Sequence, residues 1–286
     1  MRSGFVGKVI GIDLGGSTTK IMGFDGKTMI SPFLVRANDP IASVYGAFGK
    51  FLSVNSFKIE DIERIMVTGV GSSFVDSRLF GIPTAKVDEF MAIGLGGLFL
   101  SNLKKAIIVS MGTGTALVKA ENNTAVHLGG TGIGGGTLLG LSNRMLNVRH
   151  FDELIETAAG GDLSNVDLTI GDISKEALET LPSETTASNF GKISDLVTKA
   201  DLALGIINLV FQTIGMVSVF NTRIDNIKDV VLTGNLTNVP QAQNIFNQLS
   251  VLYNVNFQIP EHAEYATAVG AAICFNTEGI SMREVL

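Results

Sequence analysis

The sequence has little that would support sulfur chemistry or a strongly basic surface. It contains one cysteine, Cys274, among 286 residues, which excludes an internal disulfide and any Cys-rich metal site. Only six prolines accompany 33 glycines, a balance that indicates close backbone approaches rather than disorder. The 21 lysines and arginines are outnumbered by 27 aspartates and glutamates, for a net charge of −6. Nucleic-acid binding needs a basic face, so we expect no nucleic-acid partner.

Long apolar segments are also scarce. No apolar segment of signal-peptide length precedes the first expected strand, which predicts a cytoplasmic protein. Leu202–Phe220 is nearly long enough to span a bilayer, but it contains Asn208 and Gln212 and has no basic cluster in its immediate flank. We expect no membrane contact and interpret this segment as a helix buried in the core or at a subunit interface, with both alternatives open. Cys274, within an apolar helix, is expected to be a small core residue.

The stretch from Val9 to Phe24, VIGIDLGGSTTKIMGF, places Asp13 between an apolar strand and a glycine turn. A second strand follows instead of a helix, so neither a dinucleotide fingerprint nor a Walker loop is present. Backbone N–H groups of a glycine hairpin can bind phosphate, with hydroxyls nearby as further donors. Asp13 would then hold Mg²⁺ through water, because Mg²⁺ favours carboxylates together with substrate phosphates. The alternative is an ordinary hairpin with an exposed acid at its turn.

Two parts of the chain share one order of elements: strand, glycine turn with hydroxyls, strand, turn, strand. They cover residues 8–34 and 104–130, and we interpret them as parts of two related halves of an α/β protein, residues 1–105 and 106–286, with a cleft between them. Residues 161–185 are polar and are expected to form a surface excursion. Further strands, each entering a glycine turn, are expected at Arg64–Phe74 and Asp229–Leu236. Helices are expected at Glu89–Leu100, at Ala263–Phe275 and in the segment after Asn38-Asp39-Pro40.

Glycine turns end four of the apolar stretches: DLGGSTT, SMGTGTA, GGTGIGGGT and LTGNL. Ligands gather beyond strand ends, where loops and helix N-termini present free N–H groups. The GGGT segment before LLGLSNRML is typical of a helix N-terminus that faces an anion. We therefore expect the four turns to converge on one polyphosphate.

These segments resemble a known family. GIDLGGSTTK and SMGTGT are similar to the first two phosphate loops of the actin/Hsp70/sugar-kinase superfamily. Within it, the segments VDEF…GLGG, LGGTGIGGGTLLGL, GD…VDL and ASNFGKIS resemble the type II (eukaryotic-like) pantothenate kinases, over about Val9 to Phe275. The resemblance implies two actin-like, ribonuclease H-like domains and a homodimer. It also implies a kinase that uses ATP and Mg²⁺ to phosphorylate the primary hydroxyl of pantothenate, the first step toward coenzyme A.

The same resemblance assigns roles to individual residues. Glu89 takes the position of the general base and substrate ligand, while the adjacent Asp88 does not serve; without the resemblance, the pair indicates charges at a helix N-terminus. Asp13 would organise Mg²⁺. The nucleotide would be bound by Asp13, Gly15, Gly16, Ser17, Thr18, Lys20, Gly112, Thr113, Gly114, Gly135, Gly136, Thr137, Phe151, Gly234 and Asn235. For Lys20 and Phe151 the alternatives are a solvated strand lysine and a core residue.

One substrate position departs from the family pattern. His127 stands where relatives carry arginine, ahead of Gly129 and Gly130, which complete the expected substrate site. Arginine is always charged and binds bidentately, whereas histidine near its ordinary pKa is mostly neutral at neutral pH. His127, or another cation such as Arg144 or Arg149, would have to bind the substrate carboxylate. We therefore expect the substitution to affect substrate binding more than the fold.

Two other functions fit the phosphate loops. An ATP-driven switch module, such as the activators of radical dehydratases, would need cysteine thiolates for its iron–sulfur cluster, and the one cysteine argues against this chemistry. An amino-sugar kinase would add a clustered Cys site or a D-x-G-x-A motif, and neither is present. Phosphorylation of pantothenate, hydrolysis of ATP without an acceptor, or preference for a sugar would separate the three.

Overall fold

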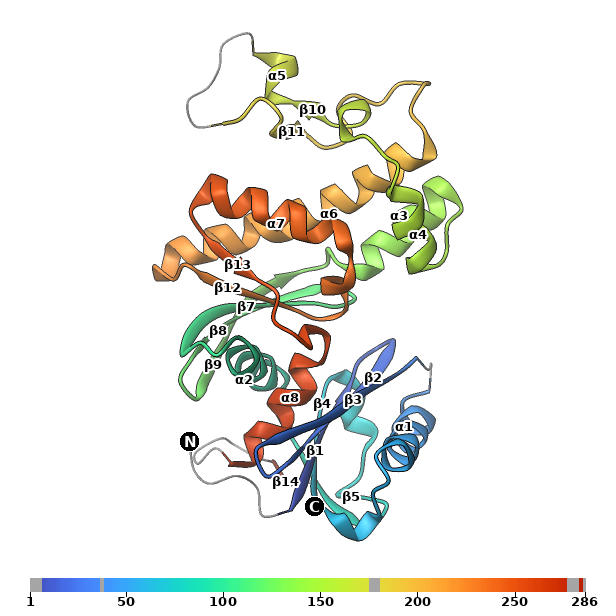
Figure 1. Cartoon of the computed structure of the whole chain (residues 1–286), viewed down its shortest axis with the longest axis vertical. Coiled ribbons are helices and arrows are strands. Elements are labelled where there is room, and N and C mark those ends of the chain that lie inside the picture. Colours follow the sequence, from blue (N-terminus) through green and yellow to red (C-terminus); the bar gives the residue numbers. More distant parts are fainter. Residues whose placement is uncertain (1–6, 37–38, 175–180, 277–282, 285–286) are drawn as a thin grey trace.

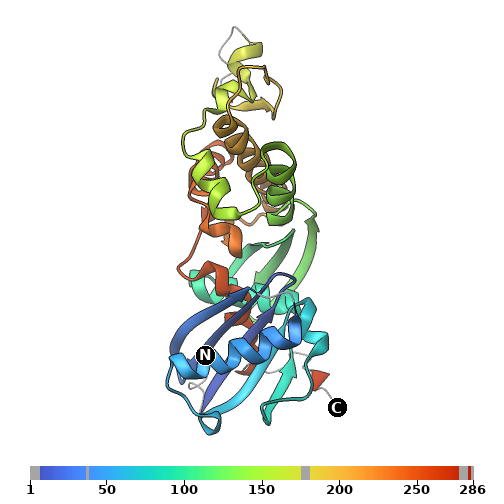
Figure 2. The same ribbon diagram turned by 90° about the vertical axis from the view of Figure 1, so that its right-hand side faces the viewer.

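The computed structural model describes residues 7–36, 39–174, 181–276 and 283–284. Two mixed sheets lie one above the other along the long axis of the molecule, with helices between them and on their outer faces (Figure 1). The view turned by 90° shows an elongated molecule with the first sheet at one end (Figure 2). The expected α/β fold with two mixed sheets flanked by helices is confirmed.

The first sheet is built around a three-stranded meander. Strands β1 (Lys8–Leu14), β2 (Thr18–Asp25) and β3 (Thr28–Arg36) pair antiparallel in sequence order. Strand β4 (Ile62–Thr68) pairs with β1 in parallel, and β6 (Ile82–Lys86) pairs with β4. Two short strands, β5 (Arg78–Leu79) and β14 (Arg283–Glu284), pair with β6. The order of the sheet is β14-β6-β4-β1-β2-β3, with β5 off this path. The predicted hairpin around Asp13 is therefore confirmed.

The second sheet repeats this arrangement. Its order is β13-β12-β7-β8-β9, with β7 (Lys105–Met111), β8 (Thr115–Glu121) and β9 (Thr124–Thr131) as the meander and β12 (Asp229–Thr233) parallel to β7. Strand β13 (Asn256–Gln258) occupies the place of β6. The expected repeat is thus present strand for strand.

Helices α2 (Glu89–Ser101) and α8 (Ala266–Ile273) lie between the sheets (Figure 1). Helix α2 packs on the second sheet, whereas α8, from beyond residue 106, packs on β1, β2 and β4 of the first. The helices cross closely because a Cβ on Gly96 would overlap the Ala266 carbonyl oxygen, and one on Gly270 would overlap that of Ala92. The boundary predicted between residues 105 and 106 falls inside β7, after its first residue Lys105, and stays a prediction.

The predicted helix at Ala263–Phe275 is divided into three pieces. A 3₁₀ turn at Ala263–Tyr265 precedes α8, and another at Cys274–Asn276 follows it. In the first turn the Ala263 carbonyl oxygen accepts a hydrogen bond from the Gly234 N–H at 3.0 Å, which connects this turn to the loop after β12. The helix therefore begins three residues later than expected.

Helix α1 (Pro40–Val54) begins where it was predicted. The Asp39 side chain accepts a hydrogen bond from the Ala42 N–H, and Pro40 occupies the first turn. Asn38, the other candidate cap, lies outside the described residues. Val44, Phe48 and Phe51 bury the apolar side of α1 against the first sheet.

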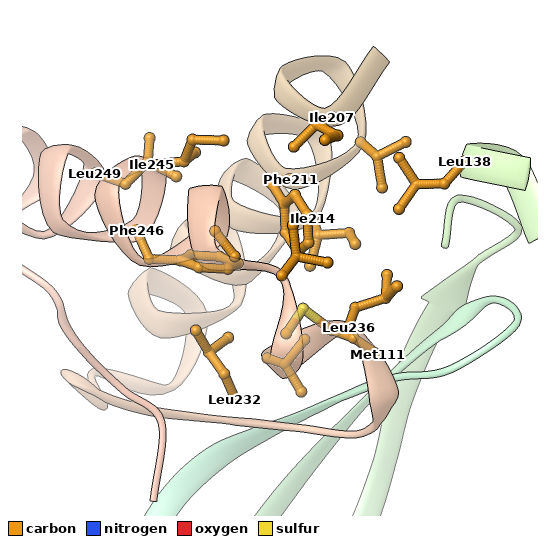
Figure 3. Close-up of a cluster of buried hydrophobic side chains, with 14 of the residues drawn as sticks. Met111, Leu138, Ile207, Phe211, Ile214, Leu232, Leu236, Ile245, Phe246 and Leu249 are labelled. Carbon is orange, nitrogen blue, oxygen red and sulfur yellow. The ribbon is translucent and has the colours of Figure 1, made fainter. Parts of the chain in front are cut away.

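The long apolar segment forms α6 (Lys199–Asp225) over the outer face of the second sheet. Among the described helices, α6 meets the length and hydropathy criteria for a membrane span, and 61% of its most apolar window is buried. It packs with α7 (Pro240–Tyr253), and the largest described core includes Phe211, Ile214 and Phe246 (Figure 3). One side of α6 is thus buried in the core, and the alternative of a subunit interface stays a prediction. Helices α3 (Gly135–Leu146) and α4 (Phe151–Ala158) pack beside α6.

The polar segment after residue 160 forms a separate layer beyond α6 (Figure 1). It contains β10 (Leu168–Thr169), α5 (Ile170–Ile173) and β11 (Thr186–Ser188), while residues 175–180 of the predicted excursion lie outside the described residues. Asp167 is buried and accepts hydrogen bonds from the Phe190 N–H at 2.9 Å and the Asn208 amide at 2.7 Å. The GD…VDL and ASNFG segments, distant in sequence, are therefore joined through one carboxylate.

Candidate functional site

Asp13 and Lys20 form a buried pair of opposite charges at the base of the first hairpin. They face each other across β1 and β2, and Lys20 Nζ lies 4.0 Å from Asp13 Oδ2. Burial raises the pKa of Asp13, with Lys20 acting in the opposite direction. Burial likewise lowers the pKa of Lys20, while Asp13 and Glu264 raise it. For both groups the cost of burial outweighs the attraction between them. A metal cation would therefore favour the charged form of Asp13, and a phosphate would favour the charged form of Lys20.

The turn between β1 and β2 has the form expected of a phosphate loop. The Gly15 N–H donates to the Thr18 carbonyl oxygen at 3.0 Å, while Gly15, Gly16 and Ser17 are exposed. Nothing lies within 4 Å of a Cβ placed on Gly16. A cavity of 230 Å³ adjoins the turn, lined by Gly15, Gly16, Thr19, Pro40, Ser43, Val70, Gly71 and Phe74. The loop is thus open to a ligand.

Asp88 and Glu89 have different surroundings, as the resemblance implies. Asp88 is the N-cap of α2, and its carboxylate accepts a hydrogen bond from the Met91 N–H at 2.9 Å. Glu89, the first residue of the helix, is half-buried. Burial raises the pKa of Glu89, and the charges of Asp13 and Asp88 raise it further. Glu89 is therefore the carboxylate with the environment of a base, and it lies within electrostatic reach of Asp13.

The second and third loops are joined directly by hydrogen bonds. The Gly135 N–H donates to the Gly112 carbonyl oxygen and the Gly136 N–H to that of Thr113, both at 2.9 Å. A Cβ on Gly134 would come within 2.6 Å of the Thr113 carbonyl oxygen. Helix α3 begins at Gly135, as predicted from the triple glycine. Gly114 and Thr137 lie in the same loops, where the Thr137 hydroxyl donates to the Gly132 carbonyl oxygen at 3.1 Å.

The fourth loop meets the others at the end of β12. Gly234 has φ of +90°, and a Cβ there would lie 2.5 Å from the Met111 carbonyl oxygen, next to Gly112. Asn235 follows and is half-buried. The 3₁₀ turn at Ala263–Tyr265 contacts both this loop and β2, which carries Lys20. It connects the loops of the second half to the charged pair of the first, and it includes Glu264, which was not anticipated from the sequence.

His127 lies on β9 and stacks on Phe90, the residue after Glu89. The two ring centroids are 3.8 Å apart and their planes differ by 13°. Gly129 and Gly130 follow, and Gly129 has φ of +143°. Phe90 was missed as a site residue, although it belongs to the DEF segment that singled out Glu89. This contact brings His127, the predicted substrate residue of the second half, next to the helix start that carries Glu89, the predicted base of the first.

Some candidates lie away from these contacts. Phe151, at the start of α4, packs half-buried on the larger core, so its expected contact with nucleotide stays a prediction. Arg144 is exposed in the last turn of α3, and the rise of the helix places it about 13 Å from Gly135. Arg149 is also exposed. The structure gives neither arginine a contact that would let it replace the family arginine at His127.

A separate cavity of 1130 Å³ lies between the excursion and helices α6 and α7, lined among others by Asp167, Asn208, Gln212, Leu249 and Tyr253. None of the predicted site residues lines it. Volume therefore does not mark the reaction site, which we place where charged groups and glycine loops converge.

The residues present fit Mg²⁺ bound together with nucleotide. In the described ranges no group of three or more His, Cys, Asp or Glu side chains could hold a metal ion, and Mg²⁺ uses one or two carboxylates with phosphates instead. Asp13 is a buried carboxylate of this kind. Cys274 is buried, and burial with the nearby Asp88 charge raises the pKa of its thiol to about 12. The prediction that Cys274 is a core residue is confirmed, and its thiol is unsuited to ligate iron.

Comparisons with known proteins agree with this arrangement. A family model described as Fumble matches residues 100–274. The chain is 29% identical to a type II pantothenate kinase from Bacillus cereus, over 93% of this chain and 98% of the relative. It is similar in structure to an activator of 2-hydroxyisocaproyl-CoA dehydratase from Clostridium difficile with bound ADPNP (TM-score 0.68, 16% identity, 93% of each chain). It also resembles a ROK family glucokinase from Streptomyces griseus (TM-score 0.60, 13% identity, 94% of this chain and 99% of the other). The two structural similarities concern the fold alone.

Proposed function

The chain belongs to the Fumble family, and from this membership we propose that it is a pantothenate kinase. It transfers the γ-phosphoryl group of ATP to the primary hydroxyl of pantothenate and forms 4'-phosphopantothenate, the first step of coenzyme A biosynthesis. The observation that carries the proposal is the half-buried Glu89, whose pKa is raised by burial and by the charge of Asp13, next in sequence to Phe90, which stacks on His127. Relatives of 28–29% identity span most of the chain.

We propose that Glu89 accepts the proton of the primary hydroxyl as the oxygen attacks the γ-phosphorus. The new O–P bond forms while the bond from phosphorus to the bridging β–γ oxygen breaks, and ADP leaves with that electron pair. Lys20 neutralises phosphate charge, and the four loops bind the phosphates through backbone N–H groups. Mg²⁺ held at Asp13 would supply neutralisation of the charge that develops on the phosphates.

The nucleotide roles of the remaining loop residues are part of this proposal. They are supported by the hydrogen bonds that join Gly135 and Gly136 to the second loop and by the contact between Gly234 and Met111. At these glycines a Cβ would face atoms of the neighbouring loop, so glycine lets the loops pack closely together. Gly129 and Gly130 follow His127 and are proposed to bind the acceptor with it.

We also propose a homodimer and a cytoplasmic location. Phe220 (52% exposed) and Ile224 (79%) on α6 and Val251 (87%) on α7 present apolar side chains to solvent. They lie at one end of the helix pair, since Arg223 stacks on Tyr253 at the same ends. Light scattering of Ile224→Lys against wild type tests this interface, and an unchanged dimer or a monomeric wild type contradicts it. The location follows from a reaction that consumes ATP.

The test of the activity is coupled ATP turnover with and without pantothenate. Glu89→Gln should lower kcat by about 10²–10⁴-fold with little change in ATP binding. Asp88→Asn is the matched control, because asparagine retains the cap of α2 and should leave turnover close to wild type. ATP hydrolysis without an acceptor would favour a switch module instead, and preference for an amino sugar would favour a different kinase.

A further inference from the structure

The hydroxyl of Thr68 is buried without a hydrogen-bond partner. Thr68 ends β4 and is 0% exposed, and among the described side chains its Oγ1 is one of two buried polar atoms with no partner. The other is Gln241 Oε1, whose own amide nitrogen still donates to the Ile155 carbonyl oxygen. Other buried threonines do find partners: Thr115, for example, donates to the Ile133 carbonyl oxygen at 2.8 Å. Thr68 is thus an exception, and a bound ligand would supply the hydrogen-bond partner that its hydroxyl lacks.

A hydroxyl in this condition opposes folding. A buried donor without a partner loses its hydrogen bonds to water and regains none. Valine has the same shape and is at least as favourable in a strand. Valine at position 68 would therefore give a more stable protein than threonine. Groups that break a local rule in this way are expected at functional sites.

The location of Thr68 supports a functional role. It is paired in register with Asp13 on the neighbouring parallel strand. Both side chains point to the α8 face of the sheet, because Met66, two residues earlier, packs with α8, and Gly11, two residues before Asp13, faces the Ala268 carbonyl oxygen. Thr68 therefore lies beside the buried carboxylate.

Thr68 also lies between Asp13 and the general base. On the other side of β4, the Val87 N–H donates to the Val67 carbonyl oxygen at 2.8 Å, immediately before the start of α2. The order of strands places Thr68, Asp13 and Lys20 in a row on β4, β1 and β2, and Glu89 follows three residues after the end of β6, the other neighbour of β4. Gly69 has φ of +86°, and a Cβ there would lie 2.8 Å from Asp13 Oδ1, so the backbone after Thr68 also contacts the carboxylate.

We propose that Thr68 is a positioning residue for hydrated Mg²⁺ that enters with ATP, with its hydroxyl binding a water ligand of the ion beside Asp13. The proposal rests on the proposed use of Mg²⁺ and ATP. Thr68 forms no hydrogen bond with Asp13, so an intervening water is needed to connect them. Mg²⁺ keeps several of its waters in protein sites, and groups in the outer shell orient them.

The experiment measures binding of a nonhydrolysable ATP analogue by calorimetry at increasing Mg²⁺ concentration, with Thr68→Val, Thr68→Ser and Asp13→Asn. Thr68→Val should need about tenfold more Mg²⁺ for half-maximal enhancement of binding, as expected when an outer-shell partner is removed. Thr68→Ser should stay within about twofold of wild type, since it keeps the hydroxyl. Asp13→Asn sets the size of the full effect.

A second readout separates this role from a structural one. Without ligands, Thr68→Val should unfold at the same temperature as wild type or a higher one, because only an unpaired hydroxyl is lost. A wild-type Mg²⁺ requirement in Thr68→Val, no effect in Asp13→Asn, or lowered unfolding temperatures in both Thr68 variants would each overturn the proposal. Because no acceptor is present, the result does not depend on whether pantothenate is the substrate.

Discussion

At the scale of the residue, the adjacent acids Asp88 and Glu89 have different surroundings at the start of α2. Asp88 is used in capping α2, whereas Glu89 is held in the first turn, half-buried and close to the Asp13 charge. Without the resemblance the pair indicated only charges at a helix N-terminus, and the resemblance selected Glu89 as the base. The cap could have been recognised from the sequence, since Asp is a preferred N-cap before an apolar helix.

The raised pKa of Glu89 gives a prediction about pH. A base acts as its carboxylate, so kcat should fall on the acid side at a pH above the usual range of glutamate, as Glu89 takes up its proton. Because the folded-state pKa of Glu89 is higher than its unfolded-state pKa, ionisation of Glu89 lowers the free energy of unfolding. This loss of stability is complete above the folded-state pKa and absent below the unfolded-state pKa. Glu89→Gln should therefore unfold at a higher temperature than wild type near neutral pH, and this difference should vanish toward acid. A constant difference at all pH values would contradict the assignment.

His127→Arg is the second prediction at this scale. Arginine can keep the stacking on Phe90 and add a permanent, bidentate charge for the substrate carboxylate, so kcat/KM for pantothenate should rise about tenfold. Val126→Arg is the control, because this exposed neighbour adds the same charge on the opposite face of β9. Unchanged or lower efficiency in His127→Arg would show that position 127 does not contact the acceptor.

At the scale of the element, the crossing of α2 and α8 decides how the sheets are joined. Strands and glycine turns were predictable because apolar runs and turn residues are local signals. The crossing was not, because Gly96 and Gly270 look like ordinary helix glycines until the partner backbone is known. The break before α8 was missed for the same reason, since it depends on a hydrogen bond to Gly234.

Gly270→Ala tests the crossing. Its new Cβ would overlap the Ala92 carbonyl oxygen, so the helices must separate, and the free energy of unfolding should fall by about 1–3 kcal/mol. Gly46 lies on the exposed side of α1, where nothing lies within 4 Å of an added Cβ. Gly46→Ala should therefore raise the free energy of unfolding by about 0.5–1 kcal/mol. Urea unfolding of both variants measures the contrast, and equal stability of Gly270→Ala and wild type would rule out a tight crossing.

At the scale of the whole molecule, the site needs both halves. Asp13, Lys20 and Glu89 come from the part before residue 105, and the second, third and fourth loops come from the part after it. The sequence predicted the convergence because strand ends carry the loops in both repeats. It could not indicate Thr68 or Glu264, whose positions matter only through pairing and contacts across distant segments.

Separated halves should not fold alone. Residues 1–105 lack α8, which covers Val9, Met22 and Met66 of the first sheet, and α2 would lose the second sheet. We expect this fragment to lack a cooperative urea transition, whereas the intact chain unfolds in one step. Circular dichroism of the fragment and of the full chain makes the comparison. Native-like, cooperative unfolding of the fragment would mean that the predicted domain boundary also marks an independent folding unit.

The contacts of α2 with α8 are reciprocal: position 96 faces residue 266 and position 270 faces residue 92, with the same spacing of four in each helix. Such matched contacts are the property of a two-fold axis, at which one surface meets its own copy. The axis here relates two parts of a single polypeptide rather than two subunits. The two halves are therefore arranged like the subunits of a symmetric dimer joined in one chain, while the proposed chemistry is asymmetric and rests on one glutamate and one histidine.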